Sequence, residues 1–194
     1  MSVVVARAAP LAALLLGGAL VVAHAQPRAE RLAACAACHG PGGQSALPGT
    51  PSLAGQPKLF IENQLVIIRE GLRDVPAMKP FLAGMADEEI VVLATYYAAQ
   101  TPKALTPPPS RDKARAGAAL AQRLSCGSCH LPTYAGQQQV PRLAGQDEAY
   151  LLQAMKQLRD SPGPGRDTIM AATLRGLSDA DLDRLAHHLA HAAP

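Results

Sequence analysis

The chain contains four cysteines, arranged as two copies of one short motif. The motif reads Cys-Ala-Ala-Cys-His at residues 35–39 and Cys-Gly-Ser-Cys-His at 126–130. In this pattern two thiols add across the vinyl groups of a porphyrin, and the adjacent histidine binds the iron. The duplication therefore predicts two covalently bound haem c groups. The predicted attachment residues are Cys35, Cys38, Cys126 and Cys129, and the predicted iron ligands are His39 and His130.

Two other chemistries use cysteine pairs of this spacing. A redox-active dithiol is expected as one pair near a βαβ pattern, whereas this chain has two pairs and no convincing strands. A structural zinc site places its ligands close together in sequence, but these pairs lie roughly 90 positions apart. Neither alternative explains a histidine directly after both pairs, so haem attachment is the favoured interpretation.

The first residues resemble an export signal. Arg7 supplies positive charge, residues 10–23 are apolar, and Ala23-His24-Ala25 is a small-x-small cleavage pattern. This predicts cleavage after Ala25 and a periplasmic location, where covalent haem attachment takes place in bacteria. An uncleaved membrane anchor stays open as the alternative.

The composition gives no argument for a nucleic-acid partner, because the formal net charge is only +3. Aromatic residues make up 3% of the chain and tryptophan is absent. That content is low for a chain that fills its own cores, and porphyrins would supply the missing apolar area.

Alanine-rich and apolar-periodic segments alternate with loops rich in glycine and proline, which predicts an all-α protein. Residues 101–109 contain four prolines and are expected to form an extended linker. We therefore expect domains at 26–100 and 110–194, each a small helical bundle around one haem. The expected helices are 28–38, 58–70, 87–99, 111–129, 147–160 and 179–191.

The two halves can be aligned, because Pro-Ser-Leu-Ala-Gly-Gln at 51–56 corresponds to Pro-Arg-Leu-Ala-Gly-Gln at 141–146. Further along, Met78 aligns with Met170, and both are expected in loops before the last helix of each half. These two methionines are the predicted second axial ligands. Met85 and Met155 align with leucines, as expected of core residues.

Three late histidines are rival iron ligands. His187, His188 and His191 have no counterparts in the first half, and we expect solvated or helix-end positions for them.

A haem histidine needs a hydrogen bond on its other ring nitrogen. Pro51 and Pro141 follow the two histidines at similar spacing and are expected to offer their carbonyl groups. Leu53 and Leu143 would then pack on the porphyrins. A role in shaping the loop alone is the alternative for the prolines.

These motifs resemble those of tandem class I cytochromes c, and within them the dihaem cytochrome c4 group. The resemblance covers essentially all of residues 28–192. It implies ligand pairs of His39 with Met78 and His130 with Met170, and two domains that face each other. Leu131 departs from the glycine that usually follows the motif.

Histidine and methionine together saturate the iron, which suits electron transfer rather than catalysis. We expect a periplasmic electron carrier that shuttles between respiratory complexes and donates to a terminal oxidase or reductase, not an enzyme. Expected partners are a haem-copper oxidase, a quinol-cytochrome c reductase or periplasmic redox enzymes, in transient contacts. Docking would be salt-sensitive if Lys58, Lys79, Lys103 or Arg142 lies near a haem edge, although all four are equally expected as a solvated surface.

Three alternatives stay open. The first is a fixed electron-transfer subunit of a larger dehydrogenase or reductase, since subunits and free carriers share this haem chemistry. The second is a haem enzyme, which would need an open iron. The third is peripheral association with the membrane instead of free diffusion.

Overall fold

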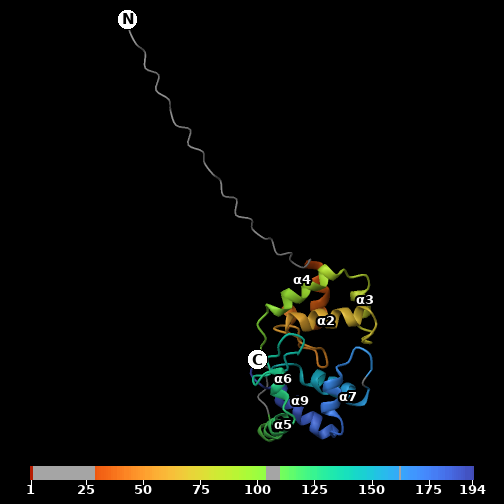
Figure 1. Ribbon diagram of the computed structural model, residues 1–194, viewed down its shortest axis with the longest axis vertical. Coiled ribbons are helices and arrows are strands. Elements are labelled where there is room, and N and C mark those ends of the chain that lie inside the picture. Colours follow the sequence, from red (N-terminus) through yellow and green to blue (C-terminus); the bar gives the residue numbers. More distant parts are fainter. Residues whose placement is uncertain (2–28, 104–109, 162) are drawn as a thin grey trace.

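The computed structural model describes Met1 and residues 29–103, 110–161 and 163–194. Within these ranges the regular elements are helical, apart from an isolated antiparallel bridge between Gln137 and Val140. The predicted all-α class is confirmed, and the helices form two bundles stacked on each other (Figure 1). Apart from Met1, the predicted export signal lies outside the described residues, as do linker residues 104–109. None of the described helices is long and apolar enough to cross a membrane.

The first bundle is built around the packing of its second helix on its last one. Its core contains Ile61 and Ile68 from one helix and Ile90, Leu93 and Tyr97 from the other, all at most 6% exposed. Periodic apolar residues thus give each helix one buried face. The elements are α1 (Ala29–His39), the 3-10 turn η1 (Pro41–Gly43), α2 (Lys58–Arg69), α3 (Lys79–Leu82) and α4 (Asp87–Ala98).

The second bundle repeats this arrangement. Its core joins Leu120, Leu151, Leu182 and Leu185, and the first and last helices approach closely at Gly117, where a Cβ would overlap the Arg184 carbonyl. The elements are α5 (Arg111–Arg123), α6 (Cys126–His130), α7 (Glu148–Asp160), α8 (Thr168–Leu174) and α9 (Asp179–Ala190).

Two features differ from the sequence prediction. The helix expected over 111–129 is broken at Ser125, whose φ of 55° and ψ of 36° are left-handed. The short helices α3 and α8 fall in segments expected to be loops, because helices of one or two turns show little apolar periodicity. The N-cap of the last helix is Ser178, which forms a reciprocal capping box with Asp181.

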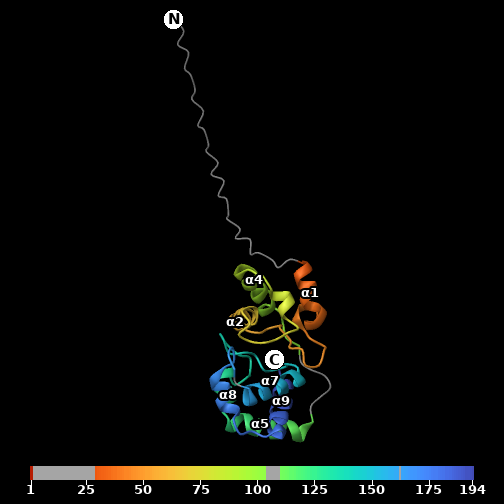
Figure 2. The ribbon, with the colours of Figure 1, turned by 90° about the vertical axis from the view of Figure 1, so that its right-hand side faces the viewer.

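The two bundles meet through buried polar groups. Ser52 and Gln56 of the first bundle and Arg142 and Gln146 of the second are 2–4% exposed. Their hydrogen bonds cross the interface, and Gly49 N–H adds a bond to Asp147 Oδ1 at 2.8 Å. Figure 2 shows the loops that carry these residues lying between the two sets of helices. The domains are therefore docked by specific directional contacts.

A strained residue follows the second haem-attachment motif. Leu131 has φ 67° and ψ 155°, a conformation that glycine adopts far more readily than leucine. Gly40 holds the equivalent place in the first bundle with φ 73° and ψ 164°. The backbone conformation is thus the same in both halves, but only the first half has a glycine there.

We expect Leu131→Gly to stabilise the holoprotein. Relief of strain, about 1–3 kcal/mol, exceeds the entropy cost of the glycine, about 0.4–1 kcal/mol. Thermal unfolding of the haem-loaded protein measures the difference. The matched control is Gly40→Ala, which should destabilise because its Cβ would overlap the Gln44 carbonyl. A lower melting temperature for Leu131→Gly would contradict this reading of the backbone.

Candidate functional site

Helix α1 carries the first Cys-x-x-Cys-His motif at its C-terminal end. Alanine-rich sequence without proline or glycine favours this helix. Cys35 is half-buried and packs against the first core, whereas Cys38, one turn later, is exposed. The two thiols and His39 therefore come from the last five residues of one rigid element.

The second motif is the whole of α6. The left-handed turn at Ser125 separates it from α5, and Ser128 closes that turn by donating both its N–H (3.0 Å) and its hydroxyl (2.7 Å) to the Ser125 carbonyl. Cys126 is half-buried against the second core, and Cys129 is exposed. The pattern of one inner and one outer cysteine is thus the same in both bundles.

Both motif histidines are buried, at 7% exposed for His39 and 4% for His130. His39 Nδ1 donates to the Pro51 carbonyl at 2.8 Å, and His130 Nδ1 donates to the Pro141 carbonyl at 2.9 Å. Burial lowers the pKa of each imidazole, against the opposing effect of the proline carbonyl. Each ring is therefore a neutral Nδ1–H tautomer whose Nε2 lone pair is the one suited to a metal.

The loops that carry the prolines also place Leu53 and Leu143 against the two cores. Leu53 N–H donates to the Gly43 carbonyl, and Leu143 N–H to the Tyr134 carbonyl. These equivalent bonds fix the loops, so each leucine lies beside the same core as the inner cysteine.

The four methionines fall into a buried pair and a half-buried pair, as the alignment of the two halves suggests. Met85 and Met155 are 4% and 7% exposed and belong to the cores, whereas Met78 and Met170 are half-buried at the core edges. Met78 precedes α3 directly, with its N–H on the Val75 carbonyl. The expectation that both lie in loops is wrong for Met170, which is in the first turn of α8.

Asp167 explains the position of Met170. Its carboxylate caps α8 by accepting from the Met170 N–H at 2.8 Å. The cap begins the helix before the methionine and so brings it into the first turn.

The residues present fit a covalently attached haem. All four cysteines are free thiols, and burial raises the pKa of Cys35 and Cys126. In each bundle the inner cysteine, the leucine and the edge methionine border one core. This donor set of two thiols, one imidazole and one thioether is the set that haem c takes.

Arg142 is a residue whose role the sequence did not reveal. Its side chain was expected on the surface, but the residue is 2% exposed between the domains. Its guanidinium donates to the Ala54 carbonyl at 2.9 Å and to the Ala144 carbonyl, while Nε has no partner among the described residues. Burial lowers its pKa to about 10, so it is still charged at neutral pH. Among the described residues, this buried cation contacts carbonyl groups and no carboxylate.

The late histidines lie at a helix end, as expected, since His187 and His188 are in the last turn of α9 and His191 is its C-cap. His187 is 7% exposed; its Nε2 accepts from Ser110 N–H at 3.0 Å, and its Nδ1 donates to Glu148 at 3.0 Å. His191 Nε2 lies 3.5 Å from the same carboxylate. Lys113 Nζ contacts Glu148 at 3.0 Å and Asp183 at 2.9 Å, which joins α5, α7 and α9.

Glu148, His187 and His191 bring their potential ligand atoms within 4.8 Å of one another. Burial raises the pKa of Glu148, but hydrogen bonds from Lys113 and His187 outweigh it and keep that pKa below its usual value. A metal on His187 Nδ1 would force a proton onto Nε2, against the Ser110 N–H. The cluster is therefore a helix-docking network, in which both ring nitrogens of His187 are engaged.

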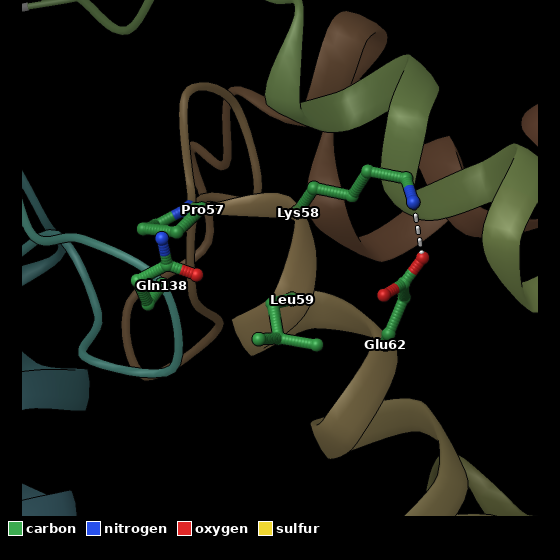
Figure 3. A pocket seen from close by; sticks show the side chains of 5 residues that line it. All are labelled: Pro57, Lys58, Leu59, Glu62 and Gln138. Carbon is green, nitrogen blue, oxygen red and sulfur yellow. Dashed lines mark ion pairs between the residues drawn. The ribbon is translucent and has the colours of Figure 1, made fainter.

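A shallow hollow lies at the boundary of the domains, lined by residues at the start of α2 and by Gln138 of the second domain (Figure 3). Lys58 Nζ and Glu62 Oε1 form an ion pair at 2.6 Å there. Because the charges neutralise each other, the hollow has no set of convergent groups for a charged ligand.

Comparison with known proteins matches both halves to cytochrome families. Residues 23–96 match the family described as cytochrome C oxidase, cbb3-type, subunit III, and residues 114–193 match the cytochrome c family. The cytochrome c4 of Thiocapsa roseopersicina is 31% identical over 168 residues, covering 80% of this chain and 85% of the relative. A thiosulfate dehydrogenase electron acceptor of Stutzerimonas stutzeri is 33% identical over 171 residues, covering 81% and 78%.

The fold agrees with these matches. The structure of reduced recombinant cytochrome c4 from Pseudomonas stutzeri superposes with a TM-score of 0.78 at 27% identity, covering 84% of this chain and 95% of that one. Each half is thus a cytochrome c domain with a Cys-x-x-Cys-His haem c site and His/Met ligation. The chain belongs to the cytochrome c4 family of dihaem electron carriers.

Proposed function

We propose that this protein carries electrons through two closed iron centres, one ligated by His39 and Met78 and the other by His130 and Met170. The observation that carries the proposal is the pair of Nδ1–H···O=C bonds, because they leave Nε2 of each buried histidine as the metal-binding nitrogen. Cys35, Cys38, Cys126 and Cys129 would hold the porphyrins covalently. The domain limits in this proposal are 26–100 and 110–194, joined by 101–109.

A bound haem c supplies an iron that takes up and releases one electron. In each domain a histidine and a methionine of the chain would hold the iron and leave it no free position for another ligand. The proline carbonyls fix the ring orientation, and Leu53 and Leu143 exclude water beside it. Such a site favours electron transfer over substrate binding.

Replacing either ligand methionine should open one iron. We expect Met78→Ala and Met170→Ala each to weaken the red sulfur-to-iron charge-transfer band by about half, since one of two sites is lost. Each variant should also bind carbon monoxide in the reduced state, as the wild type should not. Absorption spectra of the purified holoprotein measure both effects.

Met85→Leu and Met155→Leu are the matched controls, because these methionines are core residues of similar volume. They should keep the full band and stay unreactive to carbon monoxide. Loss of the band in a control, with retention in Met78→Ala or Met170→Ala, would reverse the ligand assignment. Rapid carbon monoxide binding by the wild type would favour an enzyme.

We further propose that Arg142 is the counter-charge for a haem propionate at the domain interface. Support comes from its burial without a carboxylate partner among the described residues and from its unpartnered Nε. A buried positive charge near a haem favours the ferrous state and raises the potential. Because Arg142 is buried, it cannot contact a redox partner, whereas Lys58 and Lys79 are exposed, in ion pairs with Glu62 and Asp74.

We expect Arg142→Gln to lower the reduction potential of at least one haem by about 60 mV, equivalent to a tenfold change in a one-electron equilibrium. Potentiometric titration of the holoprotein measures it. Lys58→Gln is the control, since this exposed lysine is screened by solvent and should shift neither potential by more than a small fraction of that amount. Equal potentials in Arg142→Gln and wild type would rule out the counter-charge role.

The proposed setting is the periplasm, after cleavage behind Ala25, with electrons shuttled between respiratory complexes. The favoured acceptor is a terminal oxidase or another reductase. A second candidate role is acceptance of electrons from a thiosulfate dehydrogenase, favoured by the 33% identical relative of that name. A fixed subunit of a larger dehydrogenase or reductase is the third candidate.

Three measurements separate these roles. Reduction of the oxidised holoprotein by thiosulfate with a catalytic amount of thiosulfate dehydrogenase would favour the second role. Reoxidation by membranes that contain a haem-copper oxidase supports the first. Stable co-purification with a redox enzyme at high salt would point to the fixed subunit, whereas a free monomer contradicts it.

A further inference from the structure

Two glutamines link the domains in a reciprocal way. Gln146 Oε1 accepts from Ser52 N–H at 2.7 Å, and Gln146 Nε2 donates to the Ser52 carbonyl at 2.9 Å. In the other direction, Gln56 Oε1 accepts from Arg142 N–H and Gln56 Nε2 donates to the Arg142 carbonyl, both at 2.9 Å. Each side-chain amide therefore binds both backbone groups of one residue in the opposite domain.

The orientation of these amides is fixed by the backbone. A backbone N–H can only donate and a carbonyl can only accept, so Oε1 must face the N–H and Nε2 the carbonyl. Asp147 N–H donates to Gln146 Oε1 as well, at 2.9 Å. Both glutamines are buried, at 3% and 2% exposed, where hydrogen bonds are electrostatically strong.

The residues that the glutamines bind directly follow the two prolines. The Pro51 carbonyl, which accepts from His39, and the Ser52 N–H, which donates to Gln146, belong to one peptide group. Pro141 and Arg142 share a peptide group in the same way, with His130 on the oxygen and Gln56 on the N–H. A continuous hydrogen-bonded chain thus runs from each haem-motif histidine into the other domain.

Hydrogen bonds in such a chain strengthen one another. When a peptide N–H donates, charge shifts toward its carbonyl oxygen, which becomes a better acceptor. A better acceptor strengthens the hydrogen bond from the histidine Nδ1–H, which makes the ring more basic at Nε2. A more basic ligand stabilises ferric iron and lowers the reduction potential.

We propose that Gln56 and Gln146 are positioning residues for the histidine of the opposite domain. Gln146 in the second domain acts on His39 in the first, and Gln56 in the first acts on His130 in the second. The inference rests on the proposed ligation of iron by these histidines. The potential of each haem then depends on the docked state of the other domain, because undocking removes the hydrogen bond that the opposite glutamine makes to the proline peptide.

The test is a crossed comparison of Gln146→Leu and Gln56→Leu in the holoprotein, since leucine fills a similar space without hydrogen bonds. Gln146→Leu should shift the one-electron equilibrium of the His39 haem about two- to threefold toward the ferrous state and leave the His130 haem close to wild type. Gln56→Leu should shift the His130 haem toward the ferrous state by a similar factor and leave the His39 haem close to wild type. The Nδ1–H resonance of the affected histidine, in reduced ¹⁵N-labelled protein with assigned spectra, should move upfield as its hydrogen bond weakens.

Asp147→Ala is the matched control, because the Gly49 N–H to Asp147 Oδ1 bond also crosses the interface but involves neither proline peptide. This variant should weaken the docking of the domains, and any change in reduction potential should not be confined to one haem. Gln146→Met removes the same two hydrogen bonds with an uncharged side chain of similar length. It should give the same shift, and it serves as the second variant if the leucine variant fails to fold.

Shifts of equal size at both haems, a shift at the haem of the substituted domain, or no shift would each overturn the inference. The charge-transfer band reports separately on the proposed ligands. If the band is intact and the crossed shift is absent, only the role of the glutamines fails. If the band is lost in Met85→Leu rather than Met78→Ala, the proposed ligation fails first.

Discussion

The hydrogen bond from histidine Nδ1–H to a proline carbonyl is the contact on which the rest of each domain depends. It connects the end of the attachment helix to a loop distant in sequence. That loop is tied in turn to the last helix, because Gly55 N–H donates to the Tyr97 carbonyl and Gly145 N–H to the Leu189 carbonyl. The histidine is thereby fixed by two helices and a loop before any cofactor is considered, which is how a protein orients a metal ligand.

The same loops form the interface, and this explains why buried polar residues gather there. A loop that turns its carbonyl toward a histidine has N–H groups facing away from its own core. Such groups need partners once they are buried. The glutamines of the opposite domain supply these partners, at 2.7 Å for Ser52 N–H and 2.9 Å for Arg142 N–H. Each domain therefore relies on the other for the hydrogen-bond partners of its buried backbone groups.

Much of this could be predicted from the sequence, because the informative signals were local or repeated. Two identical motif patterns predicted the haem sites, and the aligned halves separated Met78 and Met170 from the core methionines. The longer helices followed from apolar periodicity, and the cap at Ser178 from its spacing to Asp181. The hydrogen bonds of Pro51 and Pro141 are present at the expected residues.

The rest depends on contacts between segments distant in sequence. Arg142 reads as a surface residue because arginine is seldom buried, and its contact with the Ala54 carbonyl of the other domain leaves no signal in the sequence of its own half. His187 reads as a helix-end histidine, but the approach of α5 and α7 gives it Ser110 and Glu148 as partners. The break at Ser125 was hidden because a single left-handed residue leaves no periodic signal in a helical sequence.

The duplication is nearly symmetric in its backbone and unequal in its charges. Ser52 and Arg142 occupy equivalent places, and both offer their N–H and carbonyl groups to a glutamine of the other domain. Only one of the two brings a charge, in a position where burial lowers its pKa to about 10 without removing the proton at neutral pH. A buried charge acts through a lower effective dielectric than a surface charge. The two halves thus share the same hydrogen bonds to the opposite domain and differ in the charge of one side chain buried at the interface.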